Sequence, residues 1–171
     1  MRGDEAIAPT PTRQRRSARA DQPVVYSCSG CSSAAQTANA LALKLDRLGE
    51  AEMSCIVGLG GDVAPLLRLA HSGRPIVALD GCPLVCVVAT LRRHGLTPDA
   101  HLVLSEHGVR KRRHADPDDE DVNRLLPLAV ETARSTRRAG GDPAASGATP
   151  AGPRPPAEPT PTAVAGPRPG G

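Results

Sequence analysis

Five cysteines give this sequence its clearest capacity for chemistry. They form two close pairs and one isolated position: Cys28 with Cys31, Cys82 with Cys86, and Cys55 between the pairs. Thiolates bind soft metal ions such as zinc, and they also exchange with disulfides. A C-x-x-C spacing alone serves both chemistries, so the pattern predicts a cysteine site that is either a metal site or a thiol-redox site.

Strands and helices alternate along the part of the chain that holds the cysteines. Short runs rich in Val, Ile, Leu and aromatic residues predict four strands, over residues 24–27, 53–57, 75–79 and 101–105. Helical periodicity and capping residues predict four helices, over residues 33–48, 63–70, 84–94 and 117–138. Ser32 or Ser33 is expected to cap the first helix and Asp62 the second. Gly49 should end the first, and Pro127 should kink or split the last.

This alternation predicts the α/β class, with disordered termini. We expect a small parallel sheet of about four strands with helices on both faces, doubly wound like a Rossmann or flavodoxin fold, and strand 24–27 between strands 53–57 and 75–79. All five cysteines would then lie at the carboxyl edge of the sheet, where open α/β folds place their ligand crevices. Neighbouring strands are about 4.8 Å apart. Sulfurs that bind one zinc ion at about 2.3 Å lie within about 4 Å of one another, so thiols at the ends of neighbouring strands could share a zinc ion.

Two cysteines are also expected at the starts of helices. Cys31 precedes the first helix and Cys82 lies near the start of the third. The positive end of a helix dipole favours a thiolate over a thiol, which supports metal binding and redox chemistry alike. Cysteine also serves as a small buried apolar residue, but such packing would not place all five at one edge.

Composition and charge restrict the remaining possibilities. Residues 23–138 form one predicted domain; residues 1–22 lack apolar periodicity, and residues 139–171 are rich in Pro, Gly and Ala, so both ends are expected to be disordered. The domain has 14 basic and 13 acidic residues, and the chain has a single aromatic residue, Tyr26. We therefore expect no nucleic-acid partner. No apolar run is long enough to span a membrane, so a soluble, cytoplasmic protein with reduced cysteines is expected.

Other residues are also candidates for a site. Asp80, at the end of a strand, could orient a ligand of a metal or could accept hydrogen bonds from loop amides. The glycines of residues 58–61 are interpreted as a tight turn, because the third glycine of a dinucleotide fingerprint is missing. The basic run 110–114 is interpreted as a solvated segment, since acidic residues follow it. His107 is the histidine expected nearest the crevice.

Several of these motifs occur together in a known family. Cys28-Ser29-Gly30, Met53-Ser54-Cys55, the glycines of residues 58–61, residues 106–111, and above all the Asp-Gly-Cys-Pro-Leu-Val-Cys run of residues 80–86 resemble the DGC-domain family. The resemblance covers about residues 24–111. It implies a zinc-binding protein that holds its metal with four cysteines. Position by position, these are Cys28, Cys55, Cys82 and Cys86, with Cys31 as a reserve ligand or a free thiol.

The expected function is therefore zinc binding through cysteine thiolates, with a structural, sensing or metal-handling role and with no protein partner assigned. Spacing alone would have paired Cys28 with Cys31 first. Two alternatives stay open: a thiol-redox enzyme with Cys28 or Cys82 as nucleophile, and an iron–sulfur protein. No Ser-His-Asp or paired-carboxylate arrangement can be placed, so no catalytic residue is assigned and a binding role is favoured over an enzymatic one.

Overall fold

A four-stranded parallel sheet forms the centre of the molecule. The computed structural model describes residues 21–140 of the 171-residue chain. The sheet has the order β2-β1-β3-β4, and its strands are β1 (Val24–Ser27), β2 (Glu52–Met53), β3 (Ile76–Asp80) and β4 (Ala100–Val103). The α/β class and the place of β1 between β2 and β3 are confirmed. Apart from two residues each, the predicted arm 1–22 and tail 139–171 lie outside the described residues.

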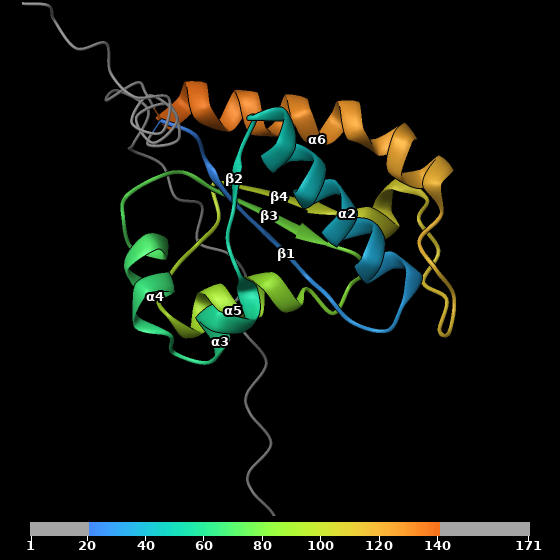
Figure 1. Ribbon diagram of the computed structural model, residues 1–171, viewed down its shortest axis with the longest axis horizontal. Coiled ribbons are helices and arrows are strands. Elements are labelled where there is room, and N and C mark those ends of the chain that lie inside the picture. The colour runs from blue at the N-terminus through green and yellow to red at the C-terminus, as the bar shows by residue number, and fades with distance from the viewer. Residues whose placement is uncertain (1–20, 141–171) are drawn as a thin grey trace, which may run out of the picture.

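Helices cover both faces of the sheet (Figure 1). One face carries α2 (Ser33–Leu48) and α6 (Asp119–Gly140), which also pack against each other. The other carries α3 (Ile56–Gly60), α4 (Ala64–Ala70) and α5 (Cys86–Arg93). β1 and β3 are buried along their whole length, as expected for parallel strands covered on both sides. None of the helices within residues 21–140 is long and apolar enough to cross a membrane.

Local signals account for the two long helices. The Ser32 hydroxyl caps α2 by accepting a hydrogen bond from the Ala35 amide at 3.4 Å, and Gly49 ends the helix in the left-handed conformation with φ of +73°. α6 has three acidic residues in its first turn and two arginines in its last, which complements its dipole. It continues through Pro127 as one helix, so the expected split does not occur.

The second predicted strand is wrong beyond Met53. β2 contains only two residues, and Cys55 is the residue that caps α3, where its sulfur accepts a hydrogen bond from the Gly58 amide at 3.4 Å. Ile56 and Val57 are therefore helical; of the glycines expected to form a turn, Gly58 and Gly60 continue that helix and Gly61 ends it. Val57 is 74% exposed. A short apolar run can form either a strand or a helix. Here the cap that Cys55 provides starts a helix at Ile56.

Other boundaries also differ from the predictions. Asp62 does not cap α4: its φ is +59°, Val63 occupies the cap position without a side-chain hydrogen bond, and the Asp62 carboxylate pairs with Arg93. The third helix begins at Cys86, because Val85 before it takes the left-handed conformation with φ of +44°. The fourth strand ends at Val103 and passes into η1 (Leu104–His107), a 3-10 helix.

Candidate functional site

Four of the five cysteines line one pocket at the carboxyl end of the sheet. The pocket has a volume of about 270 Å³. Cys28 follows β1 directly, Cys31 precedes the cap of α2, and Cys82 and Cys86 lie on either side of the turn between β3 and α5. Parallel strands end at the same edge of their sheet, which is why residues this far apart in the sequence meet here.

Cys28 forms the buried part of this pocket. Its sulfur accepts a hydrogen bond from the Gly81 amide at 3.1 Å. Burial raises the pKa of the Cys28 thiol to about 11, although that amide lowers it; the neighbouring Asp80, Cys86 and Cys82 raise it. Without a bound cation the thiol is therefore protonated at neutral pH. A metal ion would have to displace this proton in order to bind the sulfur.

Gly81 allows the two halves of the pocket to approach each other. A Cβ atom at this position would lie 2.4 Å from the carbonyl oxygen of Ala34 and 2.8 Å from the amide nitrogen of Ala35, both in the first turn of α2. Only a residue without a side chain fits against that backbone. The glycine of the Asp-Gly-Cys motif thus brings Cys82 and Cys86 next to the segment that carries Cys28 and Cys31.

Asp80 fixes the start of α5. Its carboxylate is buried; Oδ1 accepts a hydrogen bond from the Val87 amide at 3.0 Å, and Oδ2 lies 3.0 Å from Nε2 of His101 on β4. The carboxylate therefore accepts a hydrogen bond from a backbone amide, which is one of the two roles expected for it. That amide belongs to the first turn of α5, which also contains Cys86. The partner His101 was not predicted.

The remaining pocket cysteines are accessible to solvent. Cys82 is half-buried, and Cys31 and Cys86 are exposed. Cys82, expected near the start of a helix, lies before α5 instead, because Val85 holds the cap position of α5 and Cys86 is the first helical residue. Cys86 is thus the pocket cysteine that lies at the positive end of the α5 dipole.

Cys55 is not among the described residues that line the pocket. It is exposed, and its sulfur is engaged with the start of α3. Burial raises the pKa of the Tyr26 phenol, and Cys55 is one of the nearby groups that raise it further. The structure therefore brings together three of the four expected ligands with the reserve cysteine Cys31, whereas Cys55 lies at the start of α3.

Two basic side chains complete the pocket. Lys111 and Arg113 line it, and the Lys111 ammonium donates a hydrogen bond to the Cys82 sulfur at 3.4 Å. Among the described residues, no Asp or Glu lines the pocket. The interpretation of run 110–114 as merely solvated missed these two residues, although residues 106–111 were part of the family resemblance. His107, in η1, does not line the pocket.

The donor set fits zinc by its chemistry, but it is not closed around a metal position. Within residues 21–140, no three His, Cys, Asp or Glu side chains are grouped closely enough to hold a metal ion. Four thiols that open onto one pocket nevertheless match the number and type of ligands in structural zinc sites. Binding would require these sulfurs to move closer together than they are here.

Comparison with known proteins identifies the family. The model of the DGC domain matches residues 24–128. The chain belongs to the DGC-domain family. It is also 61% identical over 104 residues to the anaerobic and virulence modulator AnvM of Pseudomonas aeruginosa, a match that covers 61% of this chain and 79% of that relative. No solved structure matches the chain. The resemblance is confirmed, and the family match continues into α6.

Proposed function

We propose that this DGC-domain protein binds one zinc ion through the cysteine thiolates of its pocket and acts as a regulatory protein. The observation that carries the proposal is the pocket itself, onto which Cys28, Cys31, Cys82 and Cys86 all open. The similarity to a protein named as a modulator supports the regulatory role. A zinc ion bound by these cysteines would link the end of β1, the start of α2 and the turn between β3 and α5.

Three ligands of this proposal are the same from both lines of reasoning, namely Cys28, Cys82 and Cys86. The fourth differs: the family resemblance favours Cys55, and the pocket favours Cys31. We propose Cys31, because it lines the pocket, whereas Cys55 would have to give up its cap of α3. Cys55 as a ligand stays a prediction that the same experiment tests.

Metal analysis of the full chain, purified without oxygen, tests the proposal. We expect about one zinc per chain and no visible absorption. Cys82→Ser should lower the zinc content and the melting temperature together, because metal binding is coupled to folding. Cys31→Ser and Cys55→Ser are the matched pair: the variant that loses zinc identifies the fourth ligand. Full zinc content with unchanged melting in Cys82→Ser would refute the pocket as the metal site.

A second candidate is thiol-redox chemistry at Cys82. The contact between the Lys111 ammonium and the Cys82 sulfur favours it, since a cation next to sulfur stabilises the nucleophilic thiolate. Cys28 is less suited to this role because its pKa is raised to about 11. Metal-free protein in which Cys82 reacts much faster than the other thiols would support this candidate. A brown protein that contains sulfide would instead indicate an iron–sulfur cluster.

A further inference from the structure

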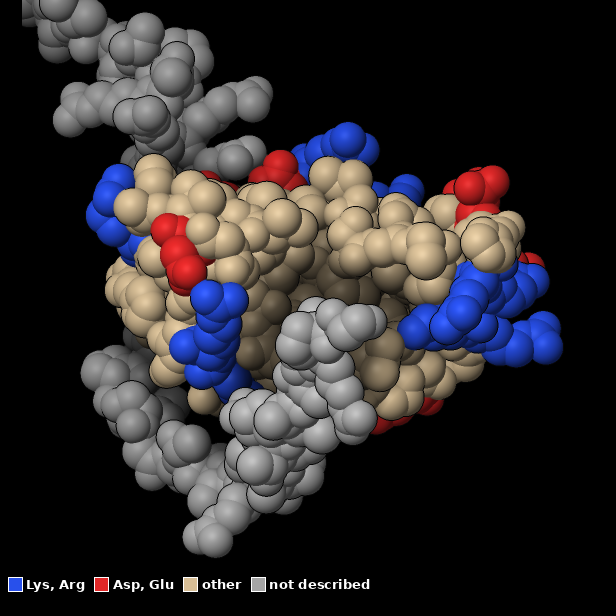
Figure 2. Space-filling model, turned by 90° about the horizontal axis from the view of Figure 1, so that it is seen from below, with Lys and Arg blue, Asp and Glu red and all other residues tan. Residues whose placement is uncertain are grey.

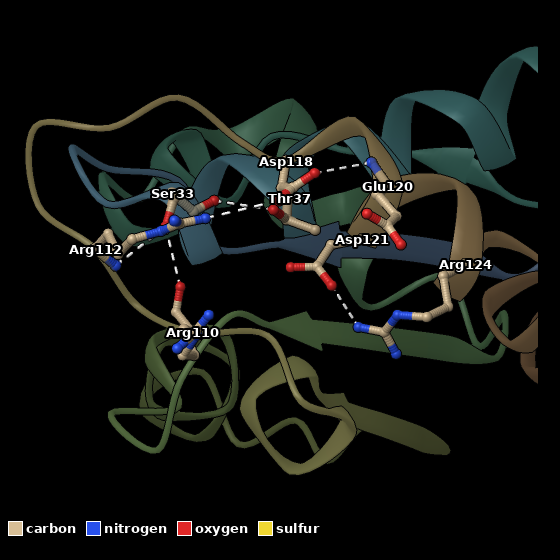
Figure 3. Close-up of polar contacts among 8 residues, drawn as sticks. All are labelled: Ser33, Thr37, Arg110, Arg112, Asp118, Glu120, Asp121 and Arg124. Carbon is tan, nitrogen blue, oxygen red and sulfur yellow. Dashed lines mark hydrogen bonds and ion pairs between the residues drawn. The ribbon is translucent and has the colours of Figure 1, made fainter.

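The segment Arg110–Arg113, called here the basic strap, is attached to the start of α2. The buried Ser33 hydroxyl donates a hydrogen bond to the Arg110 carbonyl at 3.1 Å and accepts one from the Arg112 amide at 3.1 Å. The Ser33 amide donates to the Arg112 carbonyl at 2.9 Å, and Ser32 pairs with Arg113 in an isolated antiparallel bridge. Figure 3 shows Ser33 between Arg110 and Arg112.

The charged side chains of the strap lie on two different sides of it. Lys111 and Arg113 line the pocket, whereas the Arg112 guanidinium lies 3.7 Å from the Asp118 carboxylate (Figure 3). Arg110 is exposed and is not among the lining residues. Figure 2 shows Lys and Arg side chains gathered at this end of the molecule.

These two cations match the charge of the proposed site. Four thiolates around Zn²⁺ carry a net charge of about −2, and the described lining residues add no carboxylate. We propose that Lys111 and Arg113 are the counter-cations of the thiolate site and that Ser33 positions them through the strap. Lys111 acts through its direct contact with the Cys82 sulfur, and Arg113 acts from the wall of the same pocket. The metal-bound part of this inference rests on the proposed function.

Zinc affinity of charge variants tests the counter-cations. Lys111→Gln, Arg113→Gln and the double variant of the full chain are compared by competition with a chromophoric chelator, with zinc as the only metal. We expect about fivefold weaker binding for Lys111→Gln and more than about tenfold for the double variant. Arg110→Gln is the matched control, since it removes the same charge from the same strap outside the pocket. Equal effects of Lys111→Gln and Arg110→Gln, or an unchanged double variant, would overturn the proposal.

Variants of Ser33 separate position from charge. Ser33→Ala keeps every charge but removes the hydroxyl that holds the backbone of Arg110 and Arg112. We expect it to weaken zinc binding about threefold or more, and Ser33→Thr, which retains a hydroxyl, to restore the affinity. Circular dichroism verifies the fold of both variants. Wild-type affinity in a folded Ser33→Ala variant would overturn the positioning role.

A metal-free measurement distinguishes failure of this inference from failure of the proposed function. Alkylation of Cys82 by iodoacetamide is followed by peptide mass spectrometry; the reagent is neutral, so the strap does not attract it. Lys111→Gln should change the reaction rate about threefold or more, because the ammonium that contacts the Cys82 sulfur is lost, and Arg110→Gln should leave it unchanged. If wild-type protein binds no zinc, the proposed function fails while this comparison still decides the role of Lys111. Equal rates in Lys111→Gln and Arg110→Gln would refute that role.

Discussion

Gly81 is the residue on which the close approach of the two pocket halves depends. Its missing side chain leaves room for the Ala34 carbonyl, which would lie 2.4 Å from a Cβ atom. We expect Gly81→Ala to lower the free energy of unfolding by about 2 kcal/mol or more, because backbone must move to relieve the clash. Gly30→Ala is the control: it also lines the pocket, but a Cβ there meets no atom within 4 Å. Urea unfolding that gives equal stabilities for the two variants would contradict this account.

The Cys28 thiol should make the stability of the metal-free protein depend on alkaline pH. The pKa of this thiol is raised from 9.0 to about 11 in the folded protein. The contribution of the protonated thiol to the free energy of unfolding is therefore complete below pH 9 and is lost as the pH rises through 11. We expect wild-type protein to lose about 2 kcal/mol more than Cys28→Ala across this window. Urea unfolding at pH 8, 9, 10 and 11 with a chelator measures the difference, and Cys31→Ala serves as control. Parallel curves for wild type and Cys28→Ala would show that burial does not act on this thiol.

At this scale the sequence predicts the pocket cysteines that follow long strands, and it fails for contacts that depend on packing. Cys28, Cys82 and Cys86 could be placed because β1 and β3 are apolar and unambiguous. Cys55 could not be placed in this way. The strand before it, β2, has only two residues, and the Cys55 sulfur itself caps the next helix, so no local signal marks its position. Lys111 was missed because its position depends on a hydrogen bond to Ser33, which lies far away in the sequence.

Among the elements, α5 is the one whose placement depends most directly on a single side chain. Asp80, in β3, accepts a hydrogen bond from the Val87 amide and contacts His101 in β4. It therefore joins the start of α5 to both strands. We expect Asp80→Asn to lower the free energy of unfolding by about 1–3 kcal/mol and to weaken zinc binding, since Cys86 is in the same turn. Asp99→Asn is the control, because Asp99 accepts the Ile76 amide and does not line the pocket. It should be destabilised without a change in zinc affinity; equal zinc affinity in both variants would separate Asp80 from the site.

The elements themselves differ in how far the sequence could predict them. α2 was predicted almost to the residue because its cap Ser32, its apolar face and its stop Gly49 are all local signals. The start of α5 was not, because Val85 takes a left-handed conformation that β-branched residues rarely adopt. Such a conformation persists only where surrounding contacts impose it, and those contacts are tertiary.

For the whole molecule, zinc should act as an additional link between segments that already meet at the carboxyl edge of the sheet. The pocket cysteines come from the end of β1, the start of α2 and the β3–α5 turn, so an unfolded chain cannot present them together. A ligand that binds only the folded state at 100 times its dissociation constant adds about 2.7 kcal/mol of stability. Thermal melting of the full chain should therefore shift upward with zinc and return to its starting value with a chelator.

The cysteine variants determine whether this shift comes from the pocket. Cys82→Ser should lose it, because Cys82 is a ligand in both versions of the proposed site. If Cys31 is the fourth ligand, Cys55→Ser should keep the full zinc-dependent shift, and its metal-free melting temperature should change little, because a serine hydroxyl can also cap α3. Cys31→Ser should also keep its metal-free melting temperature, but its zinc-dependent shift should be reduced. A zinc-dependent shift that survives in Cys82→Ser would mean that the metal stabilises the molecule from somewhere other than this pocket.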